Sequence, residues 1–286
     1  MKYVTAFLVL LCLLAPQLSA AESSTTLEKI KQSGTMRIGF RENEPPMSFR
    51  DENNKPTGYS IDLCTRIANE VKKTLDNQDI KIEFVPVTAA ERFDAIAKGK
   101  IDILCGSTTK TLSRAELVDF TQLTFVTGAS LLSLDGSGID GISALQDKKV
   151  AVVKGTTTID QLNRALKDAF IDATVVPVDS ATDGMKSMIA GEVDAFASDQ
   201  VVLIGLALTN KGTEKFSIAE EVFSFEPFAL AVRRNDSVFR LIADRTLSRL
   251  NRTGQISPIY GKWFGKFSSK VPIMLEAMYA LNATPE

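Results

Sequence analysis

Three arginines, Arg41, Arg92 and Arg114, stand where each could bind a carboxylate. Arg41 follows the apolar segment 36–40, which predicts a short buried strand. Arg92 falls in the first turns of a helix expected after Thr88. A guanidinium group binds a carboxylate through two parallel hydrogen bonds, so this cluster predicts a site for a molecule with two carboxylates. Ordinary pairing of each arginine with a surface Asp or Glu is the alternative.

Arg114 lies in the segment C-G-S-T-T-K-T-L-S-R-A-E at 105–116, which predicts a strand end, a loop and a helix start. Ser113 and Glu116 have the S-x-x-E spacing of a capping box, which makes Arg114 the first helical residue. A cation there opposes the helix dipole and costs about 0.3–1 kcal/mol. A bound carboxylate would offset this cost. Screening of an exposed arginine by salt is the alternative.

The second half of the chain offers groups of complementary chemistry. Asp199 directly follows an expected strand at 194–198, and its carboxylate suits an ammonium group, although it could equally cap the next helix. The turn K-G-T-T-T at 154–158 joins a strand to a helix, and the N–H groups and hydroxyls of residues such as Thr156 and Thr157 suit an anion. This turn lacks the spacing of a phosphate-binding loop, and a plain turn capped by threonine would need no ligand.

The chain contains two similar segments about 90 residues apart. Residues 85–104 and 176–196 both read as an apolar strand with a central proline, a helix, a glycine and a second strand. Ligands of such α/β sheets bind beyond the carboxyl ends of the strands, where one copy places Ser107 and Thr109 and the other places Asp199. We therefore expect two βαβ lobes that face each other across a cleft. The alternative is that strand, helix, glycine and strand form a common α/β pattern without duplication.

The hydrophobic pattern supports this α/β architecture. The first lobe is expected to contain strands at 36–40, 81–87 and 101–105, with helices that begin at Ser60 and after Thr88. The second lobe is expected to contain strands at 149–153, 173–178 and 194–198, with helices at 158–169 and 182–190. Extended crossings near 124–129 and 226–231 would form a two-strand hinge. The predicted division is lobe 1 at 22–127, lobe 2 at 128–227, and a return to lobe 1 with C-terminal helices at 228–286.

The N-terminus has the pattern of a secretory signal peptide. Lys2 precedes an apolar run from Val4 to Leu14. The small residues Ser19 and Ala21 suit cleavage after Ala21, which makes residues 1–21 the signal peptide; cleavage after Ala20 is the alternative. The apolar run is too short to span a bilayer. We therefore expect export to the periplasm. In an oxidising compartment Cys64 and Cys105 could form a disulfide, with two buried free thiols as the alternative.

Composition excludes several function classes. The formal net charge is −2 and there is no long basic stripe, which argues against a nucleic-acid partner. The chain has no histidine, the commonest general base and transition-metal ligand. No metal-binding spacing and no G-x-S-x-G motif occur. We expect no metal and no cofactor.

In these motifs the chain resembles the family 3 extracellular solute-binding proteins of polar amino-acid ABC importers, and among them the periplasmic glutamate/aspartate-binding proteins. The resemblance covers about residues 27–267. The most specific motifs are G-F-R-E-N-E-P-P-M-S-F at 39–49, G-Y-S-I-D-L at 58–63, V-P-V-T-A-A-E-R at 85–92, C-G-S-T-T-K-T-L-S-R at 105–114, K-G-T-T-T at 154–158 and K-W-F-G at 262–265.

The resemblance implies a type II periplasmic-binding-protein fold in which two lobes close on an amino acid. It implies that the α-carboxylate is held by Arg114 and Thr109 with the Thr156-Thr157 turn. Asp199, with the region of Ser107, would take the α-ammonium. It further implies that Arg41 and Arg92 take a side-chain carboxylate. The implied partner is an inner-membrane ABC permease, and we expect a monomer.

The chain departs from close acidic-amino-acid binders at two positions. Ala89 stands where those proteins have a serine, and Ala181 or Thr182 stands where they have a histidine. Glutamine, asparagine or a different dicarboxylate therefore remain open as ligands beside glutamate and aspartate.

Two other functions are consistent with the same scaffold. The first is a secreted enzyme of the cyclohexadienyl dehydratase type, in which Glu42 or Glu44 would serve as the general acid or base. The second is a detached sensor domain. The arginine cluster and the amine acceptor favour binding without turnover.

Overall fold

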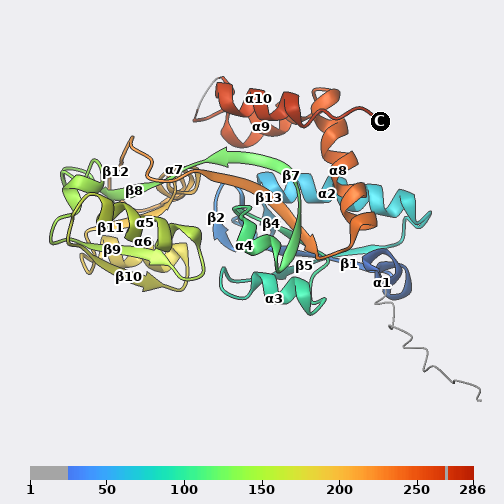
Figure 1. Ribbon diagram of the computed structural model, residues 1–286, viewed down its shortest axis with the longest axis horizontal. Coiled ribbons are helices and arrows are strands. Elements are labelled where there is room, and N and C mark those ends of the chain that lie inside the picture. The colour runs from blue at the N-terminus through green and yellow to red at the C-terminus, as the bar shows by residue number, and fades with distance from the viewer. Residues whose placement is uncertain (1–24, 268–269) are drawn as a thin grey trace, which may run out of the picture.

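The computed structural model describes residues 25–267 and 270–286 of the 286-residue chain. The predicted signal peptide at 1–21 lies outside the described residues. Figure 1 shows an elongated molecule with two lobes, which are joined where β7 (Val118–Thr127) leads into β8 (Ala129–Leu134) and where β13 (Glu226–Arg233) returns. Within the described part of the chain, no helix is both long enough and apolar enough to cross a membrane.

The first lobe is built on a five-stranded sheet in the order β5-β1-β6-β13-β7, with β5 at Lys81–Pro86, β1 at Thr35–Phe40 and β6 at Ile103–Cys105. The first three strands are parallel, and β13 pairs antiparallel with both of its neighbours. The helices of this lobe are α1 (Thr26–Ser33), α2 (Tyr59–Thr74), α3 (Arg92–Ala97), α4 (Leu112–Ala115), α8 (Ser237–Arg252), α9 (Ile256–Phe264) and α10 (Ile273–Leu281). Figure 1 shows α9 and α10 together along the side of β7.

The second lobe repeats the arrangement with a sheet in the order β10-β9-β11-β8-β12. Its further strands are β10 (Thr174–Val178), β9 (Lys149–Val153), β11 (Ala195–Asp199) and β12 (Phe216–Ile218). Its helices are α5 (Thr157–Asp168), α6 (Ala181–Ile189), α7 (Gln200–Thr209) and the 3₁₀ helix η1 (Ile142–Leu145). In both sheets three parallel strands are followed by an antiparallel strand, β13 or β8, that has just crossed from the other lobe. The predicted α/β fold of two βαβ lobes and a two-strand hinge is confirmed.

The two hinge crossings lie side by side. The first runs through Gly128, where a Cβ atom would lie only 2.5 Å from the backbone oxygen of Ser224 in the second crossing. The second crossing was expected near 226–231, but β13 already pairs with β7 from Glu226 onward. Before it, the N–H of Phe223 still donates to Ala129 of β8 at 2.9 Å. The second crossing is therefore the short stretch at about 224–225.

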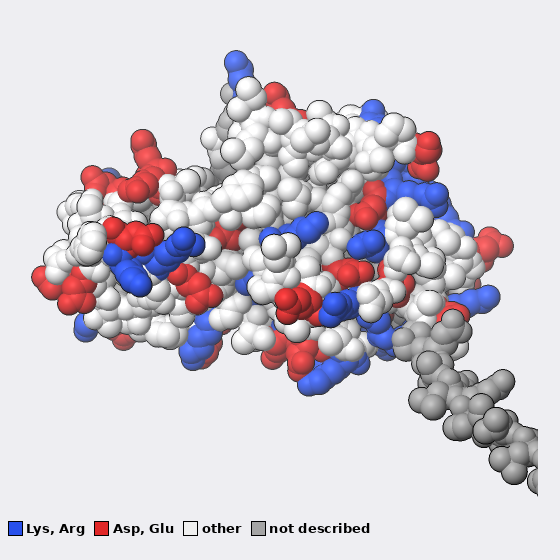
Figure 2. Space-filling model, in the orientation of Figure 1, with Lys and Arg blue, Asp and Glu red and all other residues white. Residues whose placement is uncertain are grey.

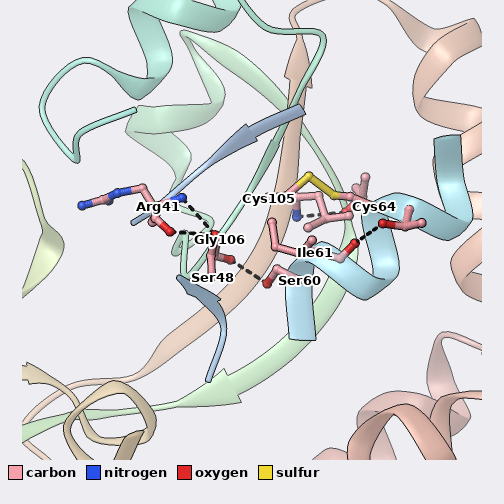
Figure 3. The surroundings of a disulfide bond; sticks show 10 residues. Arg41, Ser48, Ser60, Ile61, Cys64, Cys105 and Gly106 are labelled. Carbon is pink, nitrogen blue, oxygen red and sulfur yellow. Dashed lines mark hydrogen bonds between the residues drawn. A yellow bond between two sulfur atoms is a disulfide. The ribbon is translucent and has the colours of Figure 1, made fainter. Parts of the chain in front are cut away.

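A disulfide and a hydrogen bond join α2 to the end of β6 (Figure 3). Cys64 and Cys105 are both fully buried and are bridged, with 6.4 Å between their Cα atoms. One turn earlier in α2, the Ser60 hydroxyl donates to the Gly106 carbonyl at 3.0 Å. These two links hold the first residues of the loop that carries Ser107 and Thr109.

The segment after β1 forms a small antiparallel sheet that the hydrophobic pattern did not predict. Its strands are β2 (Asn43–Glu44), β3 (Ser48–Arg50) and β4 (Pro56–Thr57). Because β2 also packs against α6 and α7, this sheet places its residues at the boundary between the lobes.

Candidate functional site

A cavity between the lobes brings together all eight residues predicted to form a binding site. It is lined by Arg41, Glu44, Arg92, Ser107, Thr109 and Arg114 from the first lobe, and by Val153, Thr156, Thr157, Ala181, Ser198 and Asp199 from the second. Its volume is about 20 Å³, which is room for about one water molecule. The carboxyl ends of parallel strands from both sheets meet here, as the topology of such sheets requires.

Arg41 is fixed at the end of β1 and is paired with a carboxylate. Its backbone N–H donates to the Ser48 hydroxyl at 2.9 Å, and that hydroxyl donates back to the Arg41 carbonyl at 3.2 Å (Figure 3). Its Nη2 atom lies 3.0 Å from Oε1 of Glu44. The exposed fractions of Arg41 and Glu44 are only 6% and 8%, so this ion pair is largely shielded from solvent.

Arg92, the first residue of α3, is 2% exposed and has no carboxylate partner within ion-pair distance among the described residues. Its Nη1 donates to the Ala89 carbonyl at 2.7 Å, and its Nη2 donates across the cleft to the Gly155 carbonyl at 3.3 Å. Its Nε is buried without a partner. Burial, and then the charges of Arg41 and Arg114, lower the pKa of Arg92 well below its ordinary value. An anion in the cavity would stabilise this guanidinium.

The helix start at Arg114 differs from the prediction. Thr111, not Ser113, is the capping residue, and its hydroxyl accepts from the Arg114 N–H at 3.1 Å. Arg114 is therefore the third residue of α4, and the helix is only four residues long. The argument from a dipole at the start of a long helix therefore does not hold.

The Arg114 side chain nevertheless points into the cleft. Its Nη1 donates to the Thr109 carbonyl at 2.9 Å and its Nη2 donates across the cleft to the Gly155 carbonyl at 3.4 Å. Within the described chain no carboxylate lies at ion-pair distance from it. Burial is the main cause that lowers the pKa of Arg114.

Gly155 is the point where the second lobe meets both arginines. Its φ is +74°, and a Cβ atom would lie 2.9 Å from the Ala90 Cα in the first lobe. Only glycine suits this conformation and this close approach. Its carbonyl accepts from Arg92 and from Arg114, so the same oxygen holds both guanidinium groups across the cleft.

Glu226, at the start of β13, belongs to the site but was not predicted. It is 1% exposed. Its Oε2 accepts from the hydroxyls of Thr109 and Thr157, the latter at 2.8 Å, and its Oε1 accepts from Ser224 at 2.7 Å. The available signal was that Glu226 carries the single charge of the largely apolar run V-F-S-F-E-P-F-A-L-A-V at 222–232.

Asp199 has a carboxylate oxygen in need of a donor. It occupies the N-cap position of α7, yet its side chain makes no capping bond. Although the residue as a whole is partly exposed, Oδ1 is buried and has no hydrogen-bond partner. Burial first, and then the charges of Glu226 and Glu44, raise the pKa of Asp199 well above its ordinary value. An ammonium group would provide both the missing donor and the missing positive charge.

The remaining predicted residues line the cavity but have partners of their own. The Ser107 hydroxyl donates to Oε2 of Glu44 at 2.6 Å, and the Thr156 hydroxyl donates to the Val153 carbonyl at 2.7 Å within its own turn. The Thr157 hydroxyl lies 3.4 Å from that of Thr109 across the cleft.

Three guanidinium groups and two carboxylates, Glu44 and Asp199, thus line one small cavity, and a third carboxylate, Glu226, accepts from two of its lining threonines. This arrangement suits a small molecule that carries charges of both signs. Among residues 25–267 and 270–286, no group of three or more metal-ligating side chains is found.

Comparisons with known proteins show the family of this chain. Residues 36–266 match the model of the bacterial extracellular solute-binding proteins, family 3. The glutamate/aspartate import solute-binding protein of Escherichia coli (strain K12) is 29% identical over 246 residues, which are 86% of this chain and 82% of that protein. The L-glutamate/L-aspartate-binding protein of Pseudomonas aeruginosa is 30% identical over 257 residues, 90% of this chain and 85% of that protein. The solved structure of a cysteine-binding protein from Campylobacter jejuni is similar with a TM-score of 0.75 and 25% identity, covering 87% of this chain and 97% of that one.

Proposed function

Because the chain belongs to family 3 of the bacterial extracellular solute-binding proteins, we propose that it captures an amino acid with an acidic or polar side chain and delivers it to an inner-membrane ABC permease. Its fold is the type II periplasmic-binding-protein fold. The E. coli and P. aeruginosa relatives are named for glutamate and aspartate, which places these two first among the candidate ligands. The proposal depends chiefly on one observation: a cationic and an anionic side chain, Arg92 and Asp199, each have a buried polar atom without a partner in the same cavity.

We assign the ligand's groups by this chemistry. Arg114 and Thr109, with the turn of Thr156 and Thr157, hold the α-carboxylate. Support comes from Arg114, whose guanidinium group donates to the carbonyl oxygens of Thr109 and Gly155, so that its charge is available to an anion. Asp199 accepts the α-ammonium, together with Ser107, which lines the same cavity from the other lobe.

Arg41 and Arg92 are assigned to the polar end of the ligand's side chain. The lining of the cavity by both residues supports this assignment, and so does the unbonded Nε of Arg92. Ala181 also lines the cavity, and its side chain offers no hydrogen-bond donor to the ligand.

Capture requires the lobes, which we assign to 22–127 with 228–286 and to 128–227, to separate and close. A cavity of about 20 Å³ is too small for an amino acid to enter. Several contacts span the cleft and would break on opening, including the bonds of Arg92 and Arg114 to Gly155 and the ion pair of Lys211 with Glu52 at 2.8 Å. The short crossings at Gly128 and at about 224–225 are the natural hinge, because a few residues there can absorb the rotation.

We place this protein in the periplasm as a monomer after cleavage near Ala21, and we propose that it releases its ligand unchanged. The relatives are transport proteins, which supports binding without turnover. Of the two acids considered for catalysis, Glu42 is paired with Arg50 and Glu44 with Arg41. Figure 2 shows basic and acidic side chains interspersed on the face drawn, without a basic stripe of the kind that binds nucleic acid.

A thermal-shift screen against the twenty common amino acids, followed by titration calorimetry, tests this function. A ligand at 100 times its dissociation constant should add about 2.7 kcal/mol to the free energy of unfolding. We expect one ligand per chain, recovered unchanged after incubation. Stabilisation by none of the amino acids, or conversion of prephenate or arogenate to a product, would contradict the proposal.

The Asp199→Asn variant should change stability and affinity in opposite directions. Because the pKa of Asp199 is raised in the folded protein, the stability contributed by its protonated form is present below about pH 3.9 and is lost as the pH rises through the raised value. Asparagine carries no charge, so the ligand-free variant should melt at a higher temperature than the wild type at pH 7. Amino-acid affinity should fall by about 1.5–3 kcal/mol, because the ammonium loses a charged partner.

Melting curves of the ligand-free proteins from pH 4 to 8 and calorimetry at pH 7 measure the two effects. Wild-type affinity should itself weaken as the pH falls through the raised pKa of Asp199, whereas that of the variant should not. Undiminished affinity in Asp199→Asn would refute the assignment of this residue to the ammonium.

A further inference from the structure

One of the three arginines in the cleft already has a carboxylate partner. Arg41 and Glu44 form an ion pair of 3.0 Å inside the first lobe, and both are largely buried. The other oxygen of Glu44 accepts from the Ser107 hydroxyl at 2.6 Å. All three residues belong to the first lobe, so the pair does not depend on contacts across the cleft. The ion pair of Arg41 with Glu44 therefore lies at the end of the cavity that we assign to the ligand's side chain.

Glu44 changes the balance of charge in the cavity. The lining residues Arg41, Arg92 and Arg114 carry three positive charges, which are opposed by Glu44 and Asp199 in the lining and by Glu226, which accepts from two lining threonines. A zwitterion with an uncharged side chain leaves this balance unchanged. A side-chain carboxylate adds one further negative charge beside Glu44, with no positive charge to offset it, and a buried charge without compensation is costly.

We propose that Glu44 is a specificity-determining residue: by occupying Arg41, it weakens the binding of side-chain carboxylates relative to side chains that end in a carboxamide. This inference rests on the proposed amino-acid-binding function and sharpens it. A carboxamide both donates and accepts, so it can donate to Glu44 while it accepts from Arg41 or Arg92. A carboxylate has no proton to donate and meets Glu44 as a like charge.

The neighbouring glutamate on the same segment provides a matched control. Glu42 is paired with Arg50, and both side chains are substantially exposed, at 42% and 30%. Glu42 does not line the small cavity. Glu42→Gln therefore makes the same change of charge two residues away without freeing Arg41.

The test compares Glu44→Gln, Glu42→Gln and the wild type by titration calorimetry at pH 7 with glutamate, glutamine, aspartate and asparagine. For Glu44→Gln, the ratio of the dissociation constant of the amide to that of the acid should rise about tenfold or more, the effect of removing one like charge a few ångströms away in a partly shielded site. For Glu42→Gln the ratio should stay within about twofold of the wild type, because charges on a solvent-exposed pair are screened.

The outcomes separate the two proposals. An unchanged ratio in Glu44→Gln, or equal shifts in the two variants, would overturn the role of Glu44 while leaving amino-acid binding intact. Binding of no amino acid by the wild type would instead overturn the proposed function. If Glu44→Gln does not fold, Glu44→Ala carries the same comparison, since it also frees Arg41 and has no side-chain group to place beside the ligand.

Discussion

The Arg114→Ala variant should lose about 2–5 kcal/mol of amino-acid binding free energy, the range observed when one member of a desolvated charge pair is removed. This corresponds to a rise in the dissociation constant of about 30-fold or more. The reason is that Arg114 makes no ion pair with the described residues and donates only to the carbonyls of Thr109 and Gly155. Its charge is therefore free to be paired with the α-carboxylate.

Titration calorimetry with the ligand found in the screen measures this loss. Arg164→Ala is the control, because Arg164 lies on α5 with a side chain 78% exposed and only a 3.8 Å contact to Asp168. Its removal should leave the dissociation constant unchanged. Wild-type affinity in Arg114→Ala would exclude Arg114 from the carboxylate site.

Replacing both Cys64 and Cys105 with alanine should lower the free energy of unfolding by about 4 kcal/mol. The bridged residues are 41 apart in the sequence, and closing a loop of that length removes about this much conformational freedom from the unfolded chain. Both sulfur atoms are buried between α2 and β6, and alanine introduces no unsatisfied polar group there.

Urea unfolding of the double variant and of the wild type measures the difference. Wild type unfolded with a reductant present should approach the value of the variant. Thr65→Ala is the control within α2, since the Thr65 hydroxyl bonds only to the Ile61 carbonyl of its own helix at 2.8 Å. A loss below about 1 kcal/mol in the double variant would contradict an entropic contribution of this size.

The convergence of Arg41, Arg92, Arg114 and Asp199 could be predicted because of the rules of parallel sheets. The repeated β-α-β pattern fixes which strands are parallel, and residues that follow parallel strands meet at one edge of the sheet. Hydrophobic periodicity located most helices within a few residues, for instance α5 at Thr157–Asp168 against the predicted 158–169. The arginines of the site could therefore be predicted from local sequence patterns and sheet topology alone.

The parts that could not be predicted depend on contacts between distant segments. Glu226 reaches the site only because β13 returns beside β7, and the local pattern of residues 222–232 does not determine which side chains this long-range pairing brings together. Glu44 meets Arg41 through the turn that makes β2 antiparallel to β3, a path that the apolar pattern does not determine. At α4 both Thr111 and Ser113 have hydroxyls that could cap the helix, and in the structure the Thr111 hydroxyl does so.

The single oxygen of Gly155 that accepts from both Arg92 and Arg114 has a consequence for transport. Under the proposed function, the two arginines that bind the ligand also form hydrogen bonds between the lobes, so ligand binding and closure of the lobes are coupled. A permease that touches only the outer surface could then distinguish a full carrier from an empty one by its shape, without contacting the cargo itself.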